Sequence, residues 1–174
     1  YSAYSQSNGG FAFGESDTLL ERLIKDLPAF FAEAGIPYKK CFLAKPTEFY
    51  KFLTELKNKG LALEPLINNN FDGLAKIAGF KELYIRRYGR ITFRPTIDFD
   101  PKAKSLLVVG LHSDRRLVRQ HARESGLQVI IVDPELCFDE NGNTKPYPLE
   151  DVSADDLLVH MGANQFAAEM KKVL

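Results

Sequence analysis

The chain has 174 residues, of which 45% are apolar, and it contains 13 Phe and 7 Tyr. This length and composition predict one domain with a sizeable buried core and exclude a largely disordered chain. The formal net charge is zero, with 23 basic and 23 acidic side chains, so a strongly basic or strongly acidic protein is excluded as well.

The chain begins at Tyr1 rather than Met, and we expect it to be part of a larger protein. Residues 1–10 are small and polar, which is typical of a flexible lead-in or a cloning remnant, and 11–174 are expected to form a single α/β domain. Cys41 and Cys137 are too few for a disulfide scaffold and lack metal-ligand spacing. Reduced thiols in a cytoplasmic protein are therefore expected, with a single Cys–Cys bridge left open. No apolar run reaches the ~18–20 residues of a membrane span, so no membrane partner is expected.

Helices are predicted in the first half of the domain. Thr18 and Glu21 fit a capping box at the start of one helix. Pro46 suits the first position of another helix, which Gly60 closes. The apolar run 61–67 then predicts a short strand, and the segment after it a short helix.

Aromatic and β-branched residues dominate the segment from Lys81 to Asp100, which is typical of β-strands. Gly89 lies where a hairpin would turn, so an antiparallel hairpin is predicted. Pro95 indicates an edge strand or a bulge in it.

The clearest unit runs from Ser105 to Asp133, where two apolar stretches flank a helical pattern capped by Ser113 and closed by Gly126. Strand, helix and strand in this order predict a parallel βαβ crossover. A loop or hairpin and then one or two short helices are expected after it. The predicted fold class is mixed α/β (α+β, mixed sheet), with N-terminal helices, an antiparallel hairpin and one βαβ crossover in a single compact domain.

Every arginine except Arg22 falls between residues 86 and 123. On the predicted helix Arg116, Arg119 and Arg123 follow a spacing of i, i+3, i+7, so they would share one face. Guanidinium groups bind phosphates and exposed aromatic rings stack on bases, which predicts contact with nucleic acid or another phosphate ligand. An ordinary solvated face, neutralised by the acidic last third of the chain, is the alternative. The candidate binding residues are Arg86, Arg87, Arg90, Arg94, Arg115, Arg116, Arg119 and Arg123.

Asp98 and Asp100 form a D-x-D at a strand end, so their side chains would point to the same side. Asp133 closes the second strand of the βαβ unit, where ligands of open sheets gather. Three such carboxylates would hold Mg²⁺ for nuclease or nucleotidyltransferase chemistry, with His112 as acid, base or phosphate contact. Polymerase-like and primase-like enzymes use a D-x-D in this way, but no convincing histidine motif accompanies it here. The alternative is that both Asp-Pro pairs simply end strands.

The turn at 110–113 opens a helix and would attract an anion, although a generic α/β turn is the simpler interpretation. Neither GxGxxG nor GxxxxGK[ST] is present, so Rossmann cofactor binding and P-loop activity are not expected. His112, His121 and His160 lack zinc spacing. No cofactor is expected unless the Mg²⁺-dependent enzyme is correct.

No family is recognised in the sequence. Gly126–Pro134 and the strand and helix before it resemble accessory domains of large mobile-element proteins, over a stretch too short to assign any residue. We therefore expect an accessory module that binds DNA or another nucleic acid, with nucleic acid and the rest of the parent protein as partners. A Mg²⁺-dependent enzyme and a protein-interaction domain remain the alternatives.

Overall fold

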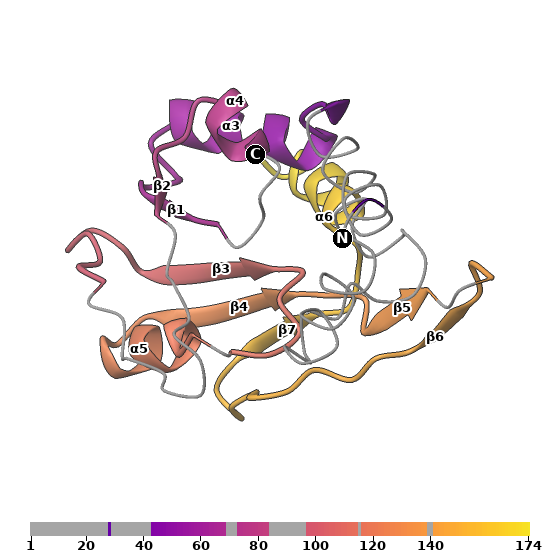
Figure 1. Ribbon diagram of the computed structural model, residues 1–174. Helices are drawn as coiled ribbons and strands as arrows, with labels where there is room; N and C mark the ends of the chain where they lie inside the picture. Colours follow the sequence, from indigo (N-terminus) through magenta and orange to yellow (C-terminus); the bar gives the residue numbers. More distant parts are fainter. Residues whose placement is uncertain (1–27, 29–42, 69–72, 84–96, 115, 139–140) are drawn as a thin grey trace. The chain divides into compact units, whose positions relative to one another are not determined.

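The computed structural model describes residues 28, 43–68, 73–83, 97–114, 116–138 and 141–174 (Figure 1). The chain divides into two units. The larger unit comprises Pro46–Asn69, Leu74–Leu136 and Pro146–Leu174, and the smaller one Tyr1–Lys45, Asn70–Gly73 and Cys137–Lys145. The predicted N-terminal helix and the boundary at residue 10 lie outside the described residues, so the predicted domain organisation stays a prediction.

A parallel sheet forms the centre of the larger unit. In the described part of the chain it has three strands in the order β3 (Ser105–Val109), β4 (Gln128–Val132) and β7 (Leu157–Val159). These strands lie side by side in Figure 1. Their β-branched and leucine side chains suit a sheet that is covered on its faces.

Helix α5 (Val118–Glu124) connects β3 to β4 and packs against both strands. Val108, Ala122, Val129 and Ile131 form one buried cluster between helix and sheet. The pairing runs in register from Ser105 opposite Gln128 onwards. The predicted parallel βαβ crossover is confirmed.

The start of α5 differs from the expectation. The helix begins at Val118, after Leu117 in a left-handed conformation with φ 55°, and not directly after Ser113. Asp114 caps it, because its Oδ1 accepts the N–H of Val118 at 2.8 Å and its Oδ2 that of Gln120 at 2.9 Å. A carboxylate with two acceptor oxygens satisfies more of the free N–H groups at a helix start than a hydroxyl can.

Helices α3 (Glu48–Asn58) and α6 (Ala163–Met170) pack against each other in the larger unit. The ring of Phe52, fully buried, meets that of Phe166 edge to face, with centroids 6.1 Å apart. The helix predicted after Pro46 is confirmed, and it ends before Gly60, which has φ 71°.

Two short strands, β1 (Leu66–Ile67) and β2 (Glu82–Leu83), pair in parallel, and the short helix α4 (Leu74–Ile77) lies between them in sequence. The predicted strand at 61–67 is therefore confirmed in its last two residues, and the helix after it is present. Most of the hairpin predicted from Lys81 falls outside the described residues.

The C-terminal third holds strands as well as a helix. Strands β5 (Leu136–Phe138) and β6 (Thr144–Pro146) pair with each other, where a loop or hairpin was expected. Of the one or two short helices predicted between Ala154 and Val173, one is present, α6. The segment 157–159 instead forms β7, because pairing with β4 satisfies its backbone. The mixed α/β class is confirmed. No described helix is long and apolar enough to span a membrane.

Candidate functional site at the carboxyl edge of the sheet

The three parallel strands end level with one another. Val109 pairs with Val132, and Val132 pairs with Val159, so the residues that follow, Gly110, Asp133 and His160, come at the same edge of the sheet. Two backbone bonds extend the pairing by one residue: the N–H of Gly110 donates to Val132 and that of Asp133 to Val159, each at 3.1 Å. Ligands of open α/β sheets bind beyond this carboxyl edge, which makes it the candidate site.

Asp133 is the central residue of this edge, and it is only 2% exposed. Its Oδ1 accepts the N–H of Glu135 at 2.7 Å. Its Oδ2 has no hydrogen-bond partner among the described residues. A buried acceptor left unsatisfied costs about 1–3 kcal/mol, and more for a charged group, so this oxygen favours a further hydrogen-bond donor.

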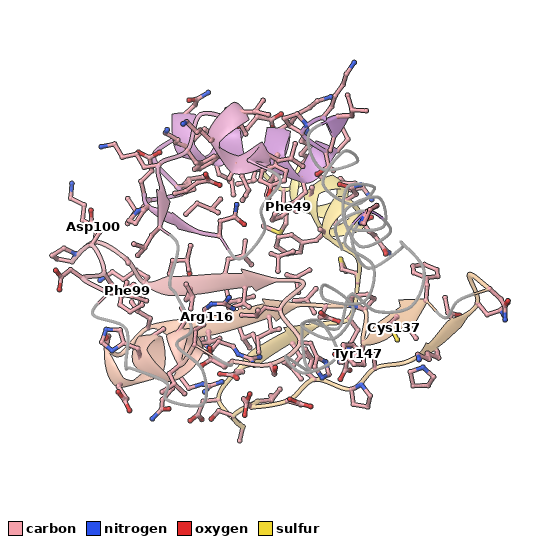
Figure 2. All side chains as sticks on the ribbon, in the orientation of Figure 1. Phe49, Phe99, Asp100, Arg116, Cys137 and Tyr147 are labelled. Atoms are coloured by element: carbon pink, nitrogen blue, oxygen red, sulfur yellow. The ribbon has the colours of Figure 1, made fainter. Side chains whose placement is uncertain are left out.

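His112 lies in the turn after β3, and its ring is stacked on Tyr147, with centroids 3.6 Å apart and planes 18° apart. Tyr147 lies on the segment that follows β6 (Figure 2). The imidazole Nε2 is 3.4 Å from Oε1 of Glu150, while Nδ1 is buried with no partner in the described part of the chain. One face of the His112 ring is thus covered by Tyr147, and its Nδ1 has no hydrogen-bond partner among the described residues.

A second histidine–glutamate pair borders the same edge. Nδ1 of His160, after β7, is 2.8 Å from Oε2 of Glu135, after β4. The other carboxylate oxygen of Glu135 accepts the N–H of Leu149 at 3.0 Å, and its carbonyl accepts that of Tyr147 at 2.7 Å. Glu135 therefore joins the segment around residue 147 to the ends of two strands.

The segment 147–156 is also tied to α5, through two arginines. Arg119 donates from Nη2 to the carbonyl of Glu150, and Arg123 from Nη2 to that of Asp151, each at 2.9 Å. Arg123 makes a second, two-point contact with the carboxylate of Asp156. Burial lowers the pKa of Arg119, against the opposing charges of Asp114 and Asp151, and the hydrogen bond to Asp156 raises the pKa of Arg123.

These contacts correct the predicted arginine surface. Arg119 is 0% exposed and Arg123 is bound to Asp156, so neither presents a free guanidinium group to a phosphate. Arg116 precedes α5 and is half-buried, so the three do not form one helical stripe (Figure 2). The other candidates, Arg86, Arg87, Arg90, Arg94 and Arg115, lie outside the described residues.

The structure does not bring the three aspartates together. Asp98 and Asp100 are exposed and precede β3, and Asp100 accepts the N–H of Lys102 at 2.8 Å. Figure 2 shows Asp100 beside the start of β3, whereas Asp133 follows the end of β4. A five-residue strand is roughly 16 Å long, and Mg²⁺ ligands lie about 2.0–2.1 Å from the ion, so Asp100 and Asp133 cannot share one. Among the described residues no group of three His, Cys, Asp or Glu could hold a metal.

An anion site was also predicted at the turn 110–113, but carboxylates of the chain itself accept the N–H groups that would bind the anion. The N–H of Asp114 donates to Oδ2 of Asp151 at 2.8 Å, and the first N–H groups of α5 are capped by Asp114. The sequence offered Asp133 and His112 as candidates for Mg²⁺ chemistry, and the structure places both after strand ends at this edge, whereas Tyr147 and Glu150 were not among the candidates. Tyr147 lies between two prolines in a segment without periodicity, so no local pattern placed it near His112.

No family model and no curated protein matches the chain. Solved structures do match. A Sir2 structure with a p53 peptide and NAD+ is 18% identical, over 88% of this chain and 80% of that chain, with a TM-score of 0.60. Sir2Tm bound to a propionylated peptide is 19% identical, over 91% and 84% of the two chains, with the same TM-score. A structure on the basis of sirtuin substrate affinity is 18% identical, over 97% and 86%, with a TM-score of 0.62.

These neighbours overturn the function expected from the sequence. They are Sir2 proteins determined with NAD+ and peptides, and not nucleic-acid-binding accessory domains or Mg²⁺-dependent nucleases. The DNA-binding accessory module and the Mg²⁺-dependent enzyme are therefore wrong, in keeping with the internal use of Arg119 and Arg123. The protein-interaction alternative stays a prediction. The absence of GxGxxG did not exclude a fold whose solved structures hold NAD+. This chain has the fold of the sirtuins.

Proposed function

We propose that this chain binds NAD at the carboxyl edge of the β3-β4-β7 sheet. The observation that carries the proposal is the buried carboxylate of Asp133, whose Oδ2 has no partner among the described residues. The sirtuin-like fold supports it, because a solved structure with this fold contains NAD+.

The position of Asp133 suits a ribose hydroxyl. In dinucleotide-binding α/β folds an acidic residue that follows the βα turn by about 20 residues accepts a hydrogen bond from the ribose. Asp133 has this placement relative to Gly110, at the end of the next strand. The Glu135 N–H holds Oδ1, so the carboxylate is oriented before a ligand arrives and little side-chain entropy remains to be lost.

Gly110 supports the same location. Its φ of 63° lies in the left-handed region, where glycine is favoured, and a Cβ added there would meet no atom within 4 Å. The backbone at the end of β3 is therefore open to close approach by a ligand, one strand away from Asp133.

The test is calorimetric titration of the full chain with NAD, with Asp133→Ala as the variant. Losing a hydrogen bond to a charged group costs about 1.5–3 kcal/mol, so we expect Kd to rise between about tenfold and a hundredfold. Asp100→Ala is a matched control: Asp100 also accepts the N–H two residues further on, but it precedes β3. No heat of binding in the wild type, or equal losses in both variants, would reject the proposal.

A second candidate, action on acylated peptides, is favoured by the neighbours' ligands. Solved structures with this fold are described with acetylated and propionylated peptides. The assay follows the mass of an acetylated lysine peptide incubated with the chain, with and without NAD. Loss of the acetyl group only when NAD is present would support this reaction, and an unchanged peptide in both would leave NAD binding as the function.

A further inference from the structure

Glu135 anchors the segment 147–151 at Tyr147 and Leu149, and the backbone of Glu150 makes two further contacts with the rest of the unit. The N–H of Glu150 donates to the carbonyl of His112 at 3.0 Å, and the carbonyl of Glu150 accepts from Nη2 of Arg119 at 2.9 Å. The N–H and the carbonyl of Glu150, which belong to two successive peptide groups, are therefore both used, one by the turn after β3 and the other by α5. Arg119 thus binds the same residue that contacts His112 through its N–H and its carboxylate.

The backbone next to Glu150 is strained, which makes an external clamp necessary. Asp151 has φ 57°, a conformation that costs a non-glycine residue of order 1–3 kcal/mol. Its carboxylate binds the N–H of Asp114, and its carbonyl accepts from Arg123. Two consecutive carbonyls, of Glu150 and Asp151, are thus turned toward two arginines one helical turn apart on α5.

Arg119 is buried with few partners for its charged group. It is 0% exposed, its closest carboxylate contact is 3.9 Å, to Asp151, and its Nε and Nη1 have no hydrogen-bond partner among the described residues. Burying a charge without a close ion pair rarely adds stability, and buried charges can instead specify one arrangement of the chain. Here, the arrangement that Arg119 would specify is the one in which the ring of Tyr147 stacks on that of His112.

We propose that Arg119 is a positioning residue for the candidate site: it fixes the Glu150 peptide, and through it the stack of Tyr147 on His112. The effect on ligand affinity rests on the proposed function, since His112 borders the edge where NAD is proposed to bind. The effect on His112 itself does not depend on any ligand.

The first experiment records the imidazole NMR signals of the full chain at one pH, for the wild type and Arg119→Met. The chain contains three histidines, His112, His121 and His160. We expect the His112 signal to move, because it loses the ring current of Tyr147. The signal of His121, which stacks on Phe99 and bonds the carbonyl of Ile97, is expected to stay in place. An unmoved His112 signal in a folded Arg119→Met protein overturns the proposal.

Phe52→Leu is the control for a general loss of stability. It weakens the contact between α3 and α6, and Phe52 contacts neither Arg119 nor Glu150. This control must leave the His112 signal unchanged, and a shift equal to that of Arg119→Met would also overturn the proposal. NAD affinity is expected to fall by about tenfold in Arg119→Met, by analogy with metal sites, where removal of a group that orients a ligand lowers metal affinity about 10–100-fold. Absence of NAD binding in the wild type rejects the proposed function and leaves the NMR result standing.

If Arg119→Met does not fold, the variant Arg119→Lys tests the positioning role of Arg119 instead. Arg119→Lys keeps the buried charge but lacks the rigid fork of the guanidinium group. The amide hydrogen of Glu150 is then expected to exchange faster than in the wild type, while that of Val129 in β4 keeps its rate. Equal exchange of the Glu150 amide in both proteins overturns the positioning role.

Discussion

The guanidinium group of Arg123 and the carboxylate of Asp156 form a two-point contact: Nε donates to Oδ1 at 2.9 Å and Nη2 to Oδ2 at 2.5 Å. The carboxylate of Asp156 is 1% exposed and also accepts the N–H of Ser153 at 2.9 Å. This pair joins α5 to the residues that lead into β7, which are distant in sequence. It is therefore a tertiary contact and not a local one.

We expect Asp156→Asn to destabilise the protein by about 1.5–3 kcal/mol, because it removes charged hydrogen bonds and leaves Arg123 without a carboxylate partner. Arg123 is 25% exposed and can still reach water, which limits the loss. The measurement is urea unfolding followed by circular dichroism. Asp155→Asn is the matched control, since it is exposed and adjacent, and a similar loss there would show that the pair is not responsible.

The same pair predicts a pH dependence. Burial raises the pKa of Asp156, but the hydrogen bonds from Arg123 and from the N–H of Ser153, together with the charge of Arg123, outweigh it, so the pKa lies below the ordinary value of 3.8. A carboxyl with a lowered folded-state pKa stabilises the fold above its unfolded-state pKa, and this stability disappears as the pH falls through the folded value. We expect the stability difference between wild type and Asp156→Asn to shrink below about pH 4. A difference that stays constant from pH 7 to pH 2 would contradict this.

Asp114→Ala is expected to cost about 1–2 kcal/mol, because the side chain caps two N–H groups at the start of α5. Thermal unfolding of the variant measures the loss. Ser113→Ala is the comparison that separates the two capping hypotheses: the sequence predicted Ser113 as the cap, and a larger loss there than for Asp114→Ala would restore that prediction.

Phe52→Ala is expected to destabilise the larger unit by about 3–5 kcal/mol, since it empties a fully buried site between α3 and α6. Leu61→Ala removes an apolar side chain that is 61% exposed and is expected to change stability by less than about 0.5 kcal/mol. Denaturant midpoints of the two variants check this, and equal shifts would refute the packing role of Phe52.

Local patterns in the sequence were sufficient for the elements with strong periodicity. The apolar strands on either side of α5 and the helix after Pro46 were predicted, because burial on one face imposes a spacing that can be recognised without the fold. The short strand β7 was missed, since three residues carry no periodic signal and its pairing partner is β4, far back in the chain.

The candidate site shows the same division. The sequence by itself determined that Asp133 ends an apolar strand and that His112 follows another, because strand ends are local features. Only the tertiary structure decided that Asp100 lies at the opposite edge, that Arg119 and Arg123 are used internally, and that Tyr147 covers His112. Each of these depends on contacts between residues separated by tens of positions, and side-chain type alone does not specify which distant partner a charge or ring will meet.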